Sequence, residues 1–230
     1  MGANAIVLNG QLGLLSQQQQ MAAGGSLFVV NCQTPGTAIA YAQLVTFSAT
    51  ANGLFVISNG AAAGGKNIYL HRLDLFQTAA VATGTTLSFE CYNETGIVAG
   101  TTAVITRTPI QINTDPGTSG AGQSSVATVQ AFNAGAITIP AAVGTRRLQG
   151  QAWIPTGVNV AKDVVSLDFG ADGPAAAKHG GAAARATDTA RLVGQMNAIV
   201  IAPQTTSWIN MWGHGTSTPS FEYNLVYSEA

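Results

Sequence analysis

Short segments in which apolar and polar residues alternate recur along this sequence, and they constrain its fold more than any other feature. The segment 85–92 alternates in this way, with apolar side chains at Leu87, Phe89 and Cys91. The segment 220–227 does the same with larger residues, at Phe221, Tyr223, Leu225 and Tyr227. Successive side chains of a strand point to opposite faces, so this period is typical of half-buried strands in antiparallel sheets. The sequence therefore predicts an all-β protein.

Twelve strand-like segments of this kind are separated by residues that favour turns. Asn52-Gly53 and Asn59-Gly60 are two such separators, in which glycine permits a positive φ. About ten to twelve short strands at this spacing predict an antiparallel β-sandwich of the jelly-roll type. The segments are 26–33, 37–47, 53–58, 67–77, 85–92, 101–107, 125–133, 145–154, 163–169, 190–202, 207–212 and 220–227.

We expect an N-terminal arm, residues 1–25, in front of one sandwich domain, residues 26–230. The arm has no core-facing pattern, and residues 10–22 predict either a short helix or an extended segment. Arms of this kind often become ordered only against a neighbour. A division of the domain near residues 110–125 is an alternative. Residues 175–190 predict a long loop, because they are rich in alanine and glycine and have no apolar stripe.

Charged residues are scarce, and this excludes several classes of protein. Asp, Glu, Lys and Arg make up 8% of the 230 residues, against about a quarter in ordinary soluble domains. The net charge of −1 provides no basic surface for nucleic acid, and a charge near zero favours self-association. We find no run of about 18 apolar residues that would span a membrane and no secretory leader, so we expect an intracellular product without a membrane partner.

Residues able to carry chemistry are few and scattered. The three histidines, His71, His179 and His214, are isolated from one another, and neither Cys32 nor Cys91 belongs to a CxxC motif, so the sequence predicts no metal site and no cofactor. The two cysteines lie in separate strand-like segments. We expect buried free thiols, with a disulfide as the alternative. Catalysis is not supported, because an enzyme gathers titratable groups in one pocket.

Two pairs of residues are better explained by structural or interface contacts. Arg72 and Asp74 are two positions apart on one strand face, which predicts an ion pair or an interface contact. Arg146 and Arg147 are the only adjacent basic pair, and neighbouring strand positions face opposite ways. One arginine would therefore lie at the rim of the core, and the other would face a partner.

Aromatic residues gather near the C-terminus, where Trp208 and Trp212 share a strand face. They either fill the sandwich core or form a subunit interface or a sugar-stacking platform. The candidate interface residues are Leu12, Leu14, Leu15, Gln17, Arg72, Arg146, Arg147, Trp208 and Trp212.

Three consecutive pieces of the C-terminal region have a recognisable order: an aliphatic run ending in proline, a tryptophan-bearing strand and a final aromatic strand. They are Asn197–Pro203, Thr206–Trp212 and Pro219–Tyr227. Together with Arg146–Asp172 they resemble virion structural proteins of tailed bacteriophages, over roughly residues 65–230. The chain departs from that pattern in its arm and in its last residues, Ser228–Ala230, where more aromatic and basic residues are expected.

The resemblance implies a capsid cement or decoration protein, made in the host cytoplasm and located on the capsid surface of the virion. Its partners would be the major capsid protein and further copies of itself in a homotrimer. The arm is the first candidate for the clamp, because an extended segment can add a strand to a neighbour's sheet edge. A tail, baseplate or receptor-binding protein that contacts glycan is the alternative, and a non-viral carbohydrate-binding sandwich is a further one.

Overall fold

A computed structural model describes residues 5–8, 11–14, 21–22, 24–32, 39–40, 48, 50–78, 86–112, 123–155, 164–170, 191–212 and 220–230. Sixteen strands account for the regular structure of this part of the chain. They are β1 (Ala5–Leu8), β2 (Gln11–Leu14), β3 (Leu27–Asn31), β4 (Ile39–Ala40), β5 (Gly53–Asn59), β6 (Ile68–Gln77), β7 (Thr86–Thr95), β8 (Val104–Arg107), β9 (Ile110–Gln111), β10 (Ala127–Phe132), β11 (Arg146–Pro155), β12 (Val164–Phe169), β13 (Arg191–Met196), β14 (Val200–Ile201), β15 (Thr205–Trp212) and β16 (Ser220–Glu229).

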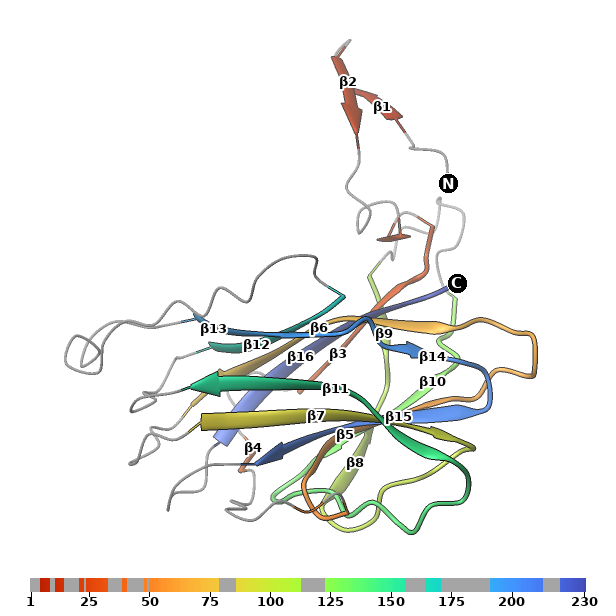
Figure 1. Cartoon of the computed structure of the whole chain (residues 1–230). Coiled ribbons are helices and arrows are strands. Elements are labelled where there is room, and N and C mark those ends of the chain that lie inside the picture. The colour runs from red at the N-terminus through yellow and green to blue at the C-terminus, as the bar shows by residue number, and fades with distance from the viewer. Residues whose placement is uncertain are drawn as a thin grey trace, which may run out of the picture.

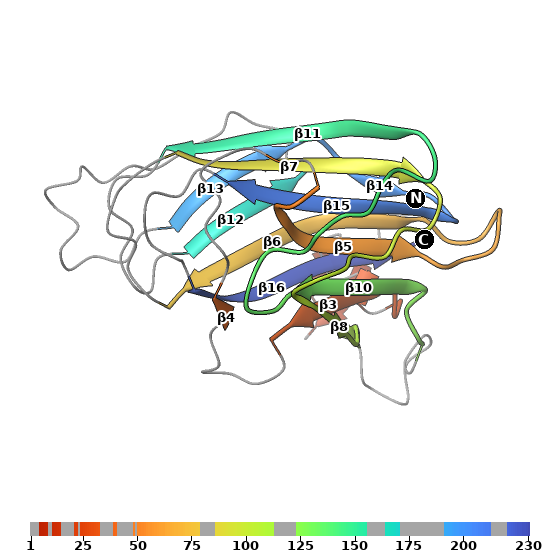
Figure 2. The same cartoon turned by 90° about the horizontal axis from the view of Figure 1, so that it is seen from below.

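Two large sheets pack face to face (Figure 1). The first, here called the β5 sheet, has the strand order β11-β7-β15-β5-β10-β8, and Figure 2 views it from outside. The second, the β6 sheet, has the order β13-β12-β6-β16-β3-β9, with β14 beside β6 and β4 beside β16. The named strand pairs are antiparallel except β12 and β13, which are parallel. The predicted all-β sandwich is confirmed.

Eight of the strands pair in a nested order. The first of them along the chain pairs with the last, β3 with β16, and the second pairs with the seventh, β5 with β15. The third pairs with the sixth, β6 with β12, and the fourth with the fifth, β7 with β11. The β16–β6 and β15–β7 pairs join these nested pairs into the two sheets. The early and late parts of the chain therefore lie side by side within each sheet.

Aromatic rings fill much of the space between the two sheets. The ring of Tyr223 lies edge-on to that of Phe55, with centroids 5.0 Å apart, and 5.5 Å from that of Phe132. Phe28 stacks on Tyr227 at 5.6 Å. Burying such large rings supplies apolar area that the many alanines of this sequence cannot. The alternating positions predicted to face the core are buried, namely Leu87, Phe89, Cys91, Phe221, Tyr223, Leu225 and Tyr227.

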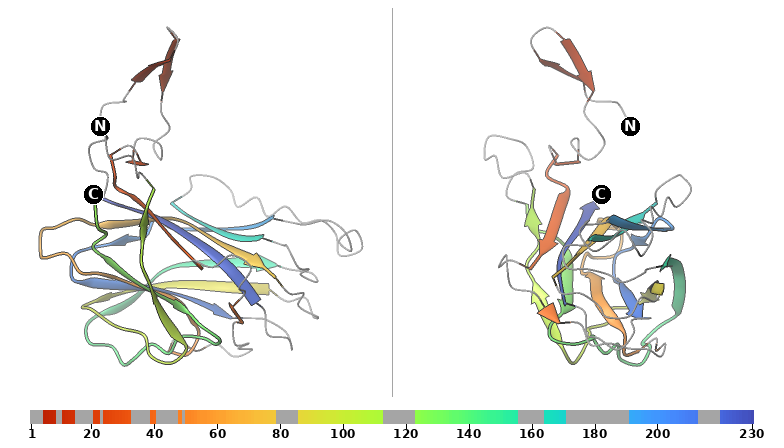
Figure 3. Two further views of the ribbon diagram at one scale, coloured as in Figure 1. Left: turned by 180° about the vertical axis from the view of Figure 1, so that it is seen from behind. Right: turned by 90° about the vertical axis from the view of Figure 1, so that its left-hand side faces the viewer.

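The arm contains a β-hairpin. Its strands β1 and β2 pair antiparallel with Ala5 opposite Leu14 and Leu8 opposite Gln11. Figure 1 and both views of Figure 3 show it standing off from the sandwich. Of the two alternatives for residues 10–22, the extended one holds for residues 11–14. In the sequence, Asn9-Gly10 stands between the two strands, and Asn-Gly is the strongest short hairpin signal.

The other strand predictions agree closely with the structure, except that of the segment 37–47 only β4 lies within the described residues. The segment 190–202, predicted as one strand, forms β13 and β14. The two-residue strand β9 was not predicted. Around the suggested division near 110–125, β8 and β10 pair with each other in the β5 sheet. The predicted loop over 175–190 lies outside the described residues.

Candidate functional site

Glu94 and Arg146 form a buried ion pair on the β5 sheet. They face each other across β7 and β11, and the Arg146 Nε and Nη2 atoms donate to Glu94 Oε2 at 2.9 and 2.8 Å. The other carboxylate oxygen accepts the backbone N–H groups of Val143 and Gly144. Arg146 Nη2 also donates to the carbonyl of Pro140 at 2.9 Å. The pair therefore ties the segment before β11 to the end of β7.

Trp208 packs within this cluster and has no exposed surface. Its indole stacks on Tyr92 with ring centroids 5.6 Å apart and an interplanar angle of 14°. The Arg146 guanidinium lies over the indole, 4.4 Å from the centroid. Ile209, the next residue, pairs with Phe55, whose ring contacts the other sheet. Because successive strand residues face opposite ways, Trp208 lies on the outer face of the β5 sheet.

Residues 96–100 and the segment around Ile137 cover part of this outer face. The hydroxyl of Thr206 accepts the N–H of Val98 at 2.9 Å and donates to the carbonyl of Gly96 at 3.0 Å. Gly100 is so close to Ile137 that a Cβ atom would lie 2.3 Å from that side chain. Trp208 therefore packs entirely within the single chain. Because no surface of its ring is accessible, the interpretation of Trp208 as a sugar-stacking platform loses its support.

The alternation of 85–92 predicts a solvated polar face on β7, but those residues are also buried. Glu90 is 5% exposed, and it accepts hydrogen bonds from the Tyr92 hydroxyl and from Gln151 Nε2, both at 2.7 Å. Burial is the main reason why the pKa of Tyr92 is raised, and the hydrogen bond to Glu90 raises it further. A carboxylate with two donors can be buried at tolerable cost.

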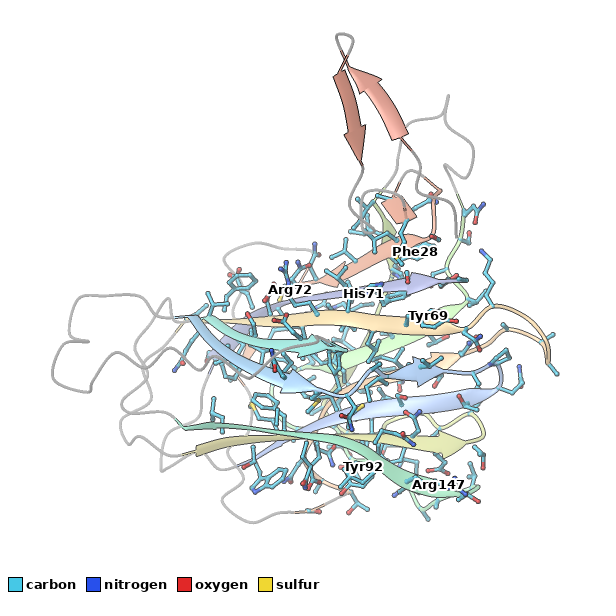
Figure 4. All side chains as sticks on the ribbon, turned by 45° about the horizontal axis from the view of Figure 1, so that its top comes forward. Phe28, Tyr69, His71, Arg72, Tyr92 and Arg147 are labelled. Carbon is cyan, nitrogen blue, oxygen red and sulfur yellow. The ribbon has the colours of Figure 1, made fainter. Side chains whose placement is uncertain are left out.

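The outer face of the β6 sheet carries the predicted Arg72–Asp74 pair. Arg72 Nε lies 2.9 Å from Asp74 Oδ2, and the hydroxyl of Ser166 donates to Asp74 Oδ1 at 2.6 Å. His71 Nε2 lies 2.8 Å from the hydroxyl oxygen of Ser228. Burial lowers the pKa of His71. Figure 4 shows His71 and Arg72 on this sheet and Tyr92 and Arg147 on the other. The ion-pair prediction is confirmed.

Arg147 is exposed, whereas the side chain of Arg146 is 17% exposed. The two neighbours therefore differ in exposure as predicted, while contact of Arg147 with a partner stays a prediction. Arg147 belongs to a cleft of about 270 Å³ at the end of β7 and β11. Its lining residues are Asn93, Glu94, Thr95, Thr145, Arg147, Gln149, Val200, Ala202 and Thr205.

A larger cleft, of about 640 Å³, lies on the β6 sheet beside β9. It is lined by Asn31, Cys32, Phe76, Ile110, Glu222, Tyr223 and Asn224. Phe76 and Ile110 are 39% and 42% exposed there. The Sγ atom of Cys32 accepts the N–H of Tyr223 at 3.3 Å. Cys32 and Cys91 are both buried and free, as expected.

The other predicted site residues are dispersed. Leu12 and Leu14 belong to β2, far from the tryptophans in Figure 1, and Trp212 is half-buried at the end of β15. Leu15, Gln17, His179 and His214 lie outside the described residues. Within the described ranges, no group of three His, Cys, Asp or Glu side chains could hold a metal ion.

No protein-family model, curated protein or solved structure matches this chain. In the part of the chain that the structure describes, no helix has the length and apolar character needed to cross a membrane. The most distinctive feature of the described residues is a two-sheet sandwich with a separate hairpin.

Proposed function

We propose that this chain is a structural virion protein of the cement or decoration type, which binds and stabilises a phage capsid by bridging neighbouring capsomers. The observation that carries this proposal is the β1–β2 hairpin, which stands off from the two-sheet sandwich. The first 25 residues contain no charged side chain. Such a hairpin is suited to join one subunit to its neighbour, and the role is mechanical rather than enzymatic.

The nested strand order supports a jelly-roll assignment. The pairs β3–β16, β5–β15, β6–β12 and β7–β11 are those of one long hairpin rolled up so that its strands are shared between two sheets. Jelly rolls build many capsid and lectin domains. Fold alone does not determine function, so the jelly-roll assignment supports the cement role only in combination with the projecting arm.

A cement protein needs a stiff body and several weak attachment points. The Glu94–Arg146 pair stiffens the sandwich by holding the segment before β11 against β7. Low charge removes long-range repulsion between copies packed on one surface. Many modest contacts to the major capsid protein and to other copies in a homotrimer would then add through multivalency.

The test is quantitative mass spectrometry of purified particles, with the copy number measured relative to the major capsid subunit. We expect a ratio near one, and loss of the protein from particles when residues 1–20 are deleted. Particles assembled with the truncated chain, which then lack this protein, should release DNA at a lower temperature. Absence of the full-length protein from particles would overturn the proposal.

Receptor binding by a tail or baseplate protein is the second candidate, and the cleft around Arg147 favours it. An exposed guanidinium with threonine hydroxyls at Thr95 and Thr145 suits a sugar carrying a carboxylate. This role predicts only a few copies per particle. It also predicts that Arg147→Ala abolishes binding to cell-surface glycan, while Lys66→Ala leaves it unchanged.

A further inference from the structure

The hairpin of the arm needs a partner surface. It consists of two four-residue strands, and an isolated two-stranded hairpin is marginally stable in water. Its register puts positions 5, 7, 12 and 14 on one face, and these are Ala5, Val7, Leu12 and Leu14. In the sequence these four positions carry no polar residue, which is the composition expected where a strand binds a partner.

A matching surface lies at the edge of the β6 sheet. The outermost strand there is β9, which pairs with β3 on one side. Ile110, in β9, and Ile112, just after it, are 42% and 43% exposed. An edge strand with exposed apolar side chains is a template for strands from another chain. The described residues of the arm leave these two isoleucines exposed.

The arm leaves the sandwich next to this edge. Gln111 Nε2 donates to the carbonyl of Gly25 at 2.7 Å, and the N–H of Ile112 donates to the carbonyl of Leu27 at 3.0 Å. Between Leu14 and Met21 the chain can span at most about 25 Å. The hairpin is therefore tethered near this edge, where a second copy that docks there would meet it.

We propose that the edge of β9, with Ile110 and Ile112, binds the β1–β2 hairpin of a second copy of this chain. The exchanged hairpin extends the β6 sheet by two strands, and its apolar residues then lie beside the two isoleucines as cross-strand neighbours. In a ring of three copies each arm passes to the next subunit, which closes the assembly. This inference deepens the proposed function, since it rests on the self-association assigned there.

A matched pair of variants tests the surface. Ile110→Lys and Ile97→Lys each place a charge at an exposed isoleucine, because Ile97 is 47% exposed and lies away from β9, just after β7. Light scattering after gel filtration should show an oligomer for the natural chain. Ile110→Lys should weaken its association at least tenfold, and Ile97→Lys should leave it unchanged. A natural chain that stays monomeric at all concentrations, or equal effects of both variants, would overturn the proposal.

Disulfide trapping tests the occupant. A Leu12→Cys chain mixed with a differently tagged Ile110→Cys chain should give a cross-linked product containing both tags on a non-reducing gel. Both chains also carry Cys32→Ser, because Cys32 lines the same cleft as Ile110, whereas Cys91 is fully buried and competes little. A Val143→Cys chain in place of the Ile110→Cys chain is the control, because Val143 is 69% exposed on another surface. Equal cross-linking in both mixtures, or none in either, would contradict the proposal.

Both experiments use purified protein without particles. Their failure removes the arm exchange but leaves incorporation into particles to be judged by mass spectrometry. Absence of the protein from particles would remove the virion role, and the arm exchange would then be decided by the light-scattering and disulfide-trapping results alone.

Discussion

The guanidinium of Arg146 lies 4.4 Å from the ring centroid of Trp208 while it donates two hydrogen bonds to the buried carboxylate of Glu94. One side chain thus joins β11, β7 and β15 on the outer face of the β5 sheet. Desolvated cation–π contacts contribute up to about 2 kcal/mol, and a buried ion pair that loses one partner leaves an uncompensated charge. Arg146 should therefore be a main determinant of stability.

Replacing Arg146 by alanine tests this directly. The free energy of unfolding should fall by about 3–5 kcal/mol, because the Glu94 carboxylate would remain buried without a counter-charge. Arg147→Ala, at the exposed neighbouring position, should change it by less than about 0.5 kcal/mol. Urea titrations of the two variants measure the difference. Equal destabilisation would show that the Glu94–Arg146 pair is not decisive.

The two tryptophans of β15 should behave differently. Trp208→Ala empties a fully buried site and should cost about 3–5 kcal/mol of stability. Trp212 is half-buried, so Trp212→Ala should cost clearly less. Thermal unfolding of both variants makes the comparison. A folded Trp208→Ala protein of unchanged stability that fails to bind glycan would restore the sugar-stacking interpretation.

Tyr223 should make the fold sensitive to alkali. Burial raises its pKa to about 12, although the hydrogen bond from Arg107 Nε opposes this shift. An unfolded tyrosine ionises near pH 10, so the contribution of Tyr223 to stability is complete below pH 10 and is lost as the pH rises toward 12. Tyr223→Phe should therefore reduce the slope of stability against pH in this window. Parallel curves for the two proteins would contradict the assignment.

His71 should act in the opposite pH range. Its pKa is lowered by burial, so the unfolded chain takes up a proton at this position before the folded chain does. Stability is then complete above about pH 6.5 and falls as the pH drops below it. His71→Gln should flatten the dependence between pH 5 and 7. Chemical denaturation at several pH values is the measurement, and an unchanged slope in the variant would rule out His71 as its source.

Local alternation was sufficient to predict most strands. The apolar residues Leu87, Phe89 and Cys91 identified the core face of β7. Every second side chain of a strand points to the same face, so the face that packs between the sheets is apolar at every second position. The hairpin was missed although Asn9-Gly10 signals it, since the glutamine run after it suggested a helix. The two-residue strand β9 is shorter than any periodic pattern, so no local rule could find it.

The site could be predicted only where its contacts are local. Arg72 and Asp74 are two positions apart and pair as expected. Arg146 and Glu94 are far apart in the sequence, and their pairing depends on the register of β11 against β7. Likewise, Glu90 can be buried because Tyr92 and Gln151 donate hydrogen bonds to its carboxylate. The contact with Gln151 comes from another strand, so the alternation within β7 does not reveal it.

The two thiols should report on self-association. Burial raises the pKa of Cys91 to about 12, and Cys91 is 0% exposed, so it should react with a thiol reagent only when the sandwich opens. Cys32 lines the cleft that contains Ile110 and is 7% exposed. It should react faster in dilute protein and more slowly as an exchanged hairpin covers that edge. Mass spectrometry resolves the two sites, and a Cys32 rate independent of protein concentration would place the hairpin elsewhere.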